Sequence, residues 1–199
     1  LRGVFLTEYG FKSRRSHQQN EHSNVFVLFF IRKEASPMNI KTLRGILETD
    51  LSLLACPRCG QSFSLSGNSL RCAGNHCYDL AAKGYVNLAP QHDQSREKYD
   101  AALFESRSIV LESGFYAPVL EAVAGMLAKR FGDSPFALAD AGCGEGYYAP
   151  ILAGRFPAAK VIGLDLSRDG ILAAARKPGN VLWLVADLKQ PPLAPGMTD

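Results

Sequence analysis

The sequence predicts an α/β protein in which helices alternate with the strands of a parallel sheet and a small cysteine-rich module comes first. Two observations lead to this prediction. From residue 136 to residue 185, short apolar segments alternate with helical segments, which is the order of a doubly wound sheet with right-handed crossovers. Four of the five cysteines lie ahead of that region, between residues 56 and 77.

Composition bounds the class of protein. The chain has 199 residues, of which 47% are hydrophobic and 21% are charged, so a packed core is expected. A net charge of +3 permits a nucleic-acid partner without predicting one. The longest apolar run, Val25–Ile31, is far shorter than the roughly 18 residues of a membrane span, so no membrane association is expected. Clustered cysteines in an odd total favour a metal site in the reducing cytoplasm over a secreted disulfide framework.

Four parts are expected along the chain. Residues 1–53 show no sustained period and are expected to be an irregular extension, with Met38, the first methionine, as a candidate natural start. The cysteine-rich module covers 54–90, a linker with two helices covers 91–132, and the sheet domain covers 133–199.

Apolar spacing predicts the individual elements. Gly114 and Gly132 suit the ends of two helices. The expected elements are helices at Ala101–Ser113 and Pro118–Phe131, then strand Phe136–Ala139, helix Tyr147–Arg155, strand Lys160–Leu164, helix Asp169–Arg176 and strand Val181–Val185. Open sheets of this class usually have about five strands or more. About three strands would therefore be an incomplete sheet, with the first strand as an exposed edge.

The cysteine-rich module has the spacing of a zinc ribbon. Cys56, Cys59, Cys72 and His76 form the pattern C-x2-C-x12-C-x3-H. Two pairs of nitrogen or sulfur ligands match a closed tetrahedral Zn²⁺ site. A module this small buries little apolar area, so metal binding would supply much of its folding free energy. Cys77 is the alternative fourth ligand, and free or disulfide-bonded cysteines are the less favoured alternatives.

A glycine loop follows the first strand of the sheet. Gly142, Gly144 and Gly146 follow Asp140 and Ala141, in the spacing G-x-G-x-G. Such a loop at a helix start lets a ligand approach the backbone closely. The dinucleotide pattern G-x-G-x-x-G would need the third glycine one residue later. The loop therefore favours S-adenosylmethionine over NAD.

Two further carboxylates are expected at the same edge of the sheet. Asp165 ends the second strand, where a carboxylate can accept both hydroxyls of a ribose, and Asp187 follows the third strand, where it can accept the adenine amino group. Tyr147 and Leu166, next to these positions, are expected to complete the cofactor site. Asp169 is read as a helix cap, and Cys143 as a small residue tolerated in the loop rather than a nucleophile.

The zinc pattern, the segment Tyr78–Leu88 and the run Asp140–Tyr148 together resemble the bacterial 23S rRNA guanine-N1 methyltransferases. The resemblance covers about residues 56 to 187 and places the zinc ligands at Cys56, Cys59, Cys72 and His76. It implies that the zinc module helps to recognise a hairpin of 23S rRNA and that the second domain binds S-adenosylmethionine. A homodimer is a separate expectation, which does not follow from the motifs. The segment around Arg107 is also typical of this family, although a solvated helix face explains Arg107 as well.

Several hypotheses about the function of this chain stay open at this point. The favoured one is a carboxyl-terminally truncated methyltransferase of this family. The alternatives are an inactive fragment, a zinc RNA-binding module without turnover, and a methyltransferase for a small molecule. No residue can be named as the base that accepts the guanine N1 proton.

Overall fold

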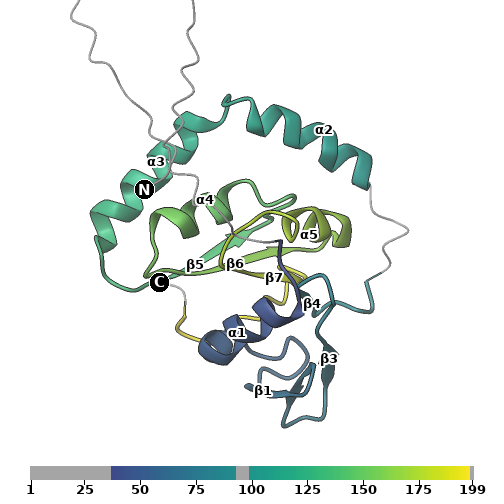
Figure 1. Ribbon diagram of the computed structural model, residues 1–199. Coiled ribbons are helices and arrows are strands. Elements are labelled where there is room, and N and C mark those ends of the chain that lie inside the picture. The colour runs from purple at the N-terminus through teal and green to yellow at the C-terminus, as the bar shows by residue number, and fades with distance from the viewer. Residues whose placement is uncertain (1–36, 93–98, 198–199) are drawn as a thin grey trace, which may run out of the picture. The chain divides into compact units, whose positions relative to one another are not determined.

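The structure is a computed structural model that describes residues 37–92 and 99–197 (Figure 1). Most of the expected extension and part of the expected linker lie outside these residues. The elements in order are α1 (Ile40–Asp50), a 3-10 turn (Leu51–Leu53), β1 (Phe63–Ser66), β2 (Ser69–Cys72), β3 (Cys77–Asp79), β4 (Tyr85–Asn87), α2 (Ala101–Glu112), α3 (Ala117–Phe131), β5 (Ala137–Ala141), α4 (Tyr148–Arg155), β6 (Lys160–Asp165), α5 (Arg168–Ala174) and β7 (Val181–Val185).

The predicted parallel sheet is confirmed. Its strands lie in the order β4-β7-β6-β5, and all of the pairings are parallel. Every residue of β7 is buried, as expected for the middle of such a sheet. β5 lies at the edge, and none of its residues is fully buried. The expectation of an exposed first strand therefore holds for the residues that the structure describes.

The sheet has one strand more than the three expected. The additional strand, β4, comes from the segment assigned to the cysteine-rich module, and it pairs with β7 from Tyr85↔Trp183 to Asn87↔Val185. Because β4 has only three residues and its partner lies almost a hundred positions later, no local pattern announces it. The module and the sheet are thus joined by backbone hydrogen bonds.

The expectation of irregular structure up to residue 53 is wrong for residues 40–53. α1 begins after Asn39, whose side chain accepts hydrogen bonds from the backbone of Lys41 and Thr42. Leu43, Ile46 and Leu47 form its buried face. The sequence contains this cap and the i, i+3, i+4 spacing of apolar residues. The apolar pattern extends over only about one and a half turns, however, which is too short to predict a helix by itself.

Helices cover both faces of the sheet (Figure 1). α4 and α5 lie on one face, and α1 lies on the other, where it contacts β7. The antiparallel sheet β1-β2-β3 forms part of the cysteine-rich module. The backbone N–H of Ala55 donates to Pro192, and that of Ala194 donates to Leu53, so the segment after β7 holds the start of the module.

The two expected helices before the sheet are present. α3 packs on α4 through Leu120 and Leu152, and Glu121 pairs with Arg155. α2 contacts α5 instead. Among the described residues no single helix is long and apolar enough to cross a membrane, although α2 and α3, bent by 75°, pass that test together by length and composition.

Candidate functional site

The cysteine-rich module brings its four predicted ligands together. Two tight turns position them: Gly60 donates its N–H to the carbonyl of Cys56 at 2.7 Å, and Asn75 donates to the carbonyl of Cys72 at 3.0 Å. The ligand atoms of Cys56, Cys59, Cys72 and His76 all lie within 4.8 Å of one another.

The spacing of these atoms fits a tetrahedral zinc ion. Nδ1 of His76 lies 3.4 Å from the Sγ atoms of both Cys56 and Cys72, and the Sγ atoms of Cys59 and Cys72 are 3.6 Å apart. Metal bonds of about 2.3 Å to sulfur and 2.0–2.1 Å to nitrogen place tetrahedral ligands roughly 3.5–3.8 Å apart. The donor set therefore fits a closed site with His76 bound through Nδ1. Cys77 is exposed on β3 and outside this cluster.

Tyr78 supports the cluster from the buried side. Its hydroxyl lies 3.8 Å from the Cys56 sulfur. Burial raises the pKa of Cys56, but hydrogen bonds from the backbone of Arg58 and from Tyr78 outweigh it, and the net shift is downward. Burial, followed by the neighbouring Cys56 sulfur, raises the pKa of Tyr78. The thiolate that a metal needs is thus favoured at Cys56, beside a tyrosine that stays protonated.

The glycine loop folds over the ends of β5 and β6. The three glycines Gly142, Gly144 and Gly146 have φ of 76°, 51° and 68°, which other residues adopt at a cost. The N–H groups of Gly142 and Cys143 both donate to the carbonyl of Leu164. The spacing G-x-G-x-G is therefore used as expected, at positions that need glycine.

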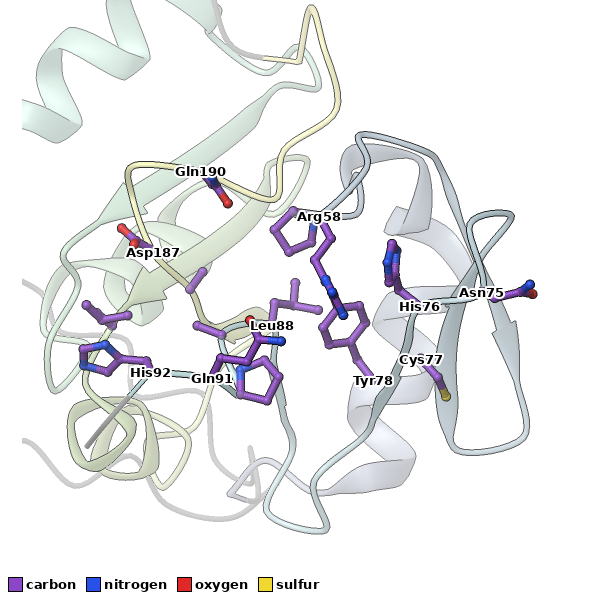
Figure 2. A pocket seen from close by; sticks show the side chains of 15 residues that line it. Arg58, Asn75, His76, Cys77, Tyr78, Leu88, Gln91, His92, Asp187 and Gln190 are labelled. Carbon is purple, nitrogen blue, oxygen red and sulfur yellow. The ribbon is translucent and has the colours of Figure 1, made fainter. Parts of the chain in front are cut away.

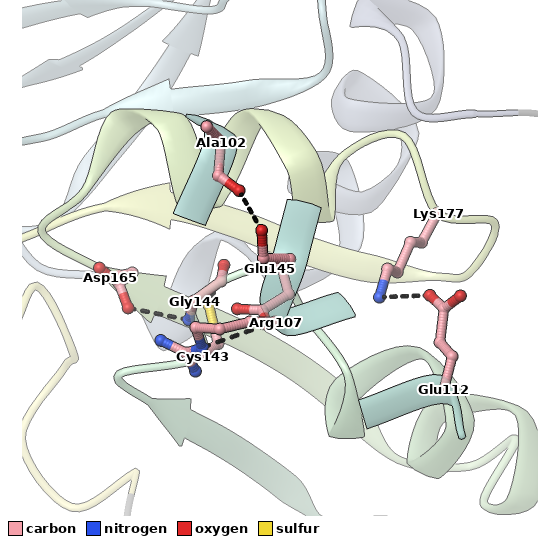
Figure 3. Close-up of polar contacts among 9 residues, drawn as sticks. Ala102, Arg107, Glu112, Cys143, Gly144, Glu145, Asp165 and Lys177 are labelled. Atoms are coloured by element: carbon pink, nitrogen blue, oxygen red, sulfur yellow. Dashed lines mark hydrogen bonds and ion pairs between the residues drawn. The ribbon is translucent and has the colours of Figure 1, made fainter. Parts of the chain in front are cut away.

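Asp165 ties this loop to the second strand (Figure 3). Its Oδ2 accepts the N–H of Gly144 at 2.8 Å, and its Oδ1 accepts the N–H of Ser167 at 2.8 Å. A carboxylate offers about four lone-pair sites, so two remain for hydroxyl donors. The backbone contacts hold the carboxylate in one orientation before a ligand arrives.

Asp140 lies deeper at the same edge. Burial, together with the nearby charge of Asp165, raises its pKa, and a hydrogen bond from the backbone of Ala149 offsets this in part. Its Oδ2 is buried and has no hydrogen-bond partner. An unpartnered buried oxygen at a loop of this kind is suited to receive a cationic donor from a ligand.

Cys143 is not suited to act as a nucleophile. Burial, and then the charges of Asp140 and Asp165, raise the pKa of its thiol. The buried side chain is therefore a neutral thiol, in agreement with the structural role expected for it.

A cleft of about 430 Å³ opens between the zinc module and the segments that follow β6 and β7 (Figure 2). Leu166 and Asp187 line it from the sheet, whereas Arg58, His76 and Tyr78 line it from the zinc module. Asp187 accepts the N–H of Lys189, which holds its side chain at the end of β7. The structure thus places all of the predicted cofactor residues except Tyr147 at or beside the carboxyl ends of β5, β6 and β7. Tyr147 stands just before α4, where its ring contacts Tyr148.

Helix α2 brings residues to the loop that were not predicted for the site. The ring of Phe104 is buried against Gly144 and Gly170. Glu145, inside the loop, is only 1% exposed and pairs with Arg107 of α2. An acidic residue between two loop glycines was the available signal for Glu145, but its partner lies 38 positions earlier (145 − 107) and could not be identified from spacing.

Comparison with known proteins agrees with both halves of the site. Residues 54–96 match the zinc-ribbon family described as "RlmA, N-terminal", and residues 138–199 match the family described as "Methyltransferase domain". The protein YxjB of Bacillus subtilis (strain 168), whose name assigns it provisionally to the 23S rRNA (guanine-N1)-methyltransferases, is 38% identical over 150 residues, which are 72% of this chain and 52% of YxjB.

A second relative is the 23S rRNA (guanine(748)-N(1))-methyltransferase of Streptomyces fradiae. It is 32% identical over 137 residues, which are 68% of this chain and 48% of that protein. The chain therefore spans about half the length of the curated relatives it matches. Among solved structures, the plantazolicin methyltransferase BpumL has a TM-score of 0.36 at 21% identity, covering 45% of this chain and 34% of BpumL.

Proposed function

We propose, from the membership of this chain in the zinc-ribbon-containing family of 23S rRNA (guanine-N1)-methyltransferases, that it forms the zinc and cofactor-binding part of such an enzyme. The observation that carries the proposal is the glycine loop, which is tied through Gly144 to Asp165 at the carboxyl ends of the strands. The reaction would transfer the methyl group of S-adenosylmethionine to N1 of a guanine.

In this proposal each part of the cofactor has its own group of binding residues. Asp165 would accept the ribose hydroxyls, and Leu166 and Asp187 would hold the adenine in the cleft. Asp140 would receive the ammonium group at its unpartnered oxygen, beside the backbone of Gly142–Gly146. The bound cofactor supplies an electrophilic methyl group, and these residues align it by binding the rest of the molecule.

Zinc has a structural part in this proposal. Cys56, Cys59, Cys72 and His76 would complete its coordination, with no open position for a reactive water. The zinc module would contact a hairpin of 23S rRNA, and Arg58 at the mouth of the cleft offers a positive charge for a phosphate. A homodimer and a cytoplasmic location belong to the same proposal.

Calorimetry with S-adenosylhomocysteine tests the cofactor proposal directly. We expect the chain to bind this ligand and not NAD, and we expect Asp165→Ala to weaken binding at least about 100-fold, because it removes charge-assisted hydrogen bonds to both loop and ligand. Asp133→Ala, which removes an exposed carboxylate just before β5, is the matched control and should change nothing. Absence of binding to the wild-type chain would favour an inactive fragment. The RNA substrate is tested separately, by measuring the affinity for a 23S rRNA hairpin at increasing salt concentration. An affinity that does not change with salt would count against an RNA substrate.

Asp140→Asn should separate stability from binding. The pKa of Asp140 is raised above its usual value of 3.8, so this carboxyl stabilises the fold below the unfolded pKa and loses that contribution as the pH rises through the folded pKa. The neutral amide avoids this loss, and we expect the ligand-free variant to be more stable at pH 7 by on the order of 1 kcal/mol. Its affinity for S-adenosylmethionine should fall, because the ammonium group loses an ionic partner. Thermal unfolding at pH 5 and pH 7 measures the change in stability, and calorimetry measures the change in affinity. A variant less stable than wild type at pH 7 would contradict the argument.

A further inference from the structure

Helix α2 forms one wall of the glycine loop. Phe104 packs so closely there that a Cβ added at Gly170 would lie 2.9 Å from its ring, and one added at Gly144 would lie 3.5 Å from it. Asp100 caps the helix by accepting the N–H of Leu103, so α2 begins just before Phe104. The helix is therefore held at the loop by packing, independently of any charge.

Arg107 follows Phe104 by three residues in α2, and both side chains lie against Gly144. Figure 3 shows Arg107 beside the glycine loop. Its guanidinium is 5.7 Å from the centre of the Phe104 ring, and its Nε is 3.4 Å from Oε1 of Glu145. Its two terminal nitrogens face the loop instead, 3.6 and 3.9 Å from where a Cβ of Gly144 would stand. The side chain of Arg107 is 47% exposed, so a ligand on the loop can reach it.

The ion pair with Glu145 is made through Nε of Arg107 and does not use its two terminal nitrogens. Both carboxylate oxygens of Glu145 are buried without a hydrogen-bond partner, and the 3.4 Å contact is longer than the roughly 2.7–2.9 Å of a charge-assisted hydrogen bond. Glu145 orients the guanidinium through Nε and holds its charge at the loop. The fork of terminal N–H groups is left for a second carboxylate, the geometry that arginine binds best.

The charges around the loop explain why such a cation is needed. Asp140, Glu145 and Asp165 place three carboxylates at or beside it. The amino-acid end of S-adenosylmethionine has an ammonium group, which these acids attract, and a carboxylate, which they repel. Among the described contacts of the loop, Arg107 is the cation that can offset this repulsion.

We propose that Arg107, oriented by Glu145 and Phe104, binds the methionyl carboxylate of the cofactor through its terminal nitrogens. This inference rests on the proposed function, because it assumes that the loop holds S-adenosylmethionine. It gives α2 a direct part in cofactor selection, and it distinguishes ligands with the carboxylate from those without it.

The competing explanation is that Arg107 only fastens α2 to the loop. In that case its removal would weaken every adenosyl ligand alike, because all of them use the loop. If Arg107 binds the carboxylate, its removal weakens only those ligands that carry one. A pair of ligands that differ in this group alone therefore separates the two roles.

Calorimetry with S-adenosylhomocysteine and with its decarboxylated analogue, in which only the carboxylate is missing, is the test. For Arg107→Met in the full 199-residue chain, we expect the affinity for S-adenosylhomocysteine to fall about tenfold to a hundredfold and the affinity for the analogue to change less than about twofold. Lys129→Met, which removes an exposed cation from α3, should leave both affinities unchanged.

Three outcomes overturn the inference in different ways. Unchanged affinities in Arg107→Met would remove any role in binding, and an equal loss for both ligands would leave only the fastening role. Absence of binding to the wild-type chain would instead overturn the proposed function itself. If Arg107→Met does not fold, Arg107→Lys decides the question: it keeps the cation but loses the planar fork, so a severalfold loss confined to S-adenosylhomocysteine is expected.

Discussion

Removing zinc, or one of its ligands, is expected to unfold the module between residues 54 and 80. Three strands of three or four residues bury little apolar area by themselves, so the module depends on the bonds between the metal and its four ligand atoms. Apparent binding free energies of structural zinc in isolated fingers are about 10–16 kcal/mol at neutral pH, so the loss of the metal outweighs the other interactions of the module. Limited proteolysis followed by mass spectrometry should show new cleavage sites between Cys56 and Tyr78 in Cys72→Ser or after chelation.

Cys77, the cysteine that belongs neither to the metal cluster nor to the glycine loop, provides a matched control. Cys77 lies only five positions after Cys72 but is exposed and outside the cluster, so Cys77→Ser should retain one zinc ion per chain and the protease resistance of wild type. Loss of zinc from Cys77→Ser, with retention in His76→Ala, would assign the fourth ligand to Cys77 instead.

The damage should extend beyond the module itself. Buried residues of the module and of the parallel sheet, among them Leu70, Val86 and Leu184, belong to one continuous cluster. β4 pairs directly with β7, and Arg58 and Tyr78 line the cleft that also contains Asp187. We therefore expect zinc-depleted protein to unfold over a broader temperature range and at a lower midpoint than the zinc-bound protein.

Local patterns in the sequence were sufficient for much of the fold. Val181–Val185 is a run of five apolar residues, and the structure has β7 with these same bounds. β5 and β6 extend one or two residues beyond the expected ends, because β5 pairs with β6 as far as Ala141 and β6 pairs with β7 as far as Asp165. The cysteine spacing and the glycine spacing each concern residues within one turn or hairpin, so the residues they single out are close together in the structure.

What could not be predicted depends on contacts between distant segments. β4 is defined by its pairing with β7. The pair of Arg107 with Glu145 joins α2 to a loop from which α3 and β5 separate it along the chain. The cleft is similar, since it forms where the zinc module meets the ends of the parallel strands. The sequence thus indicates which groups carry the chemistry, whereas their mutual orientation follows from packing.

Trp183 is the central example of such packing. It is the chain's single tryptophan, is 1% exposed, and lies on β7 directly beside Gly163 of β6. Its indole fills the space between two glycines: a Cβ at Gly163 would lie 2.2 Å from Cζ3 of the ring, and a Cβ at Gly146 would lie 2.6 Å from Cη2. Real Cβ atoms do not approach other atoms this closely. The positions of Gly163 in the strand and of Gly146 in the glycine loop therefore both require a residue without a side chain.

Gly163→Ala is therefore expected to destabilise the protein strongly and to disturb the cofactor loop at the same time. The new methyl group must displace a rigid, enclosed ring toward Gly146, and overpacking of this kind costs about 3 kcal/mol, or roughly 6–12 °C in Tm for a chain of this size. Gly154→Ala in α4 is the matched control, because a Cβ there meets nothing within 4 Å; a helical alanine should stabilise the protein by about 0.5–1 kcal/mol. Chemical denaturation followed by the fluorescence of Trp183 measures both variants. The opposite signs are the decisive result, since equal and small effects would mean that the indole can move aside and that Gly163 and Gly146 are not coupled through it.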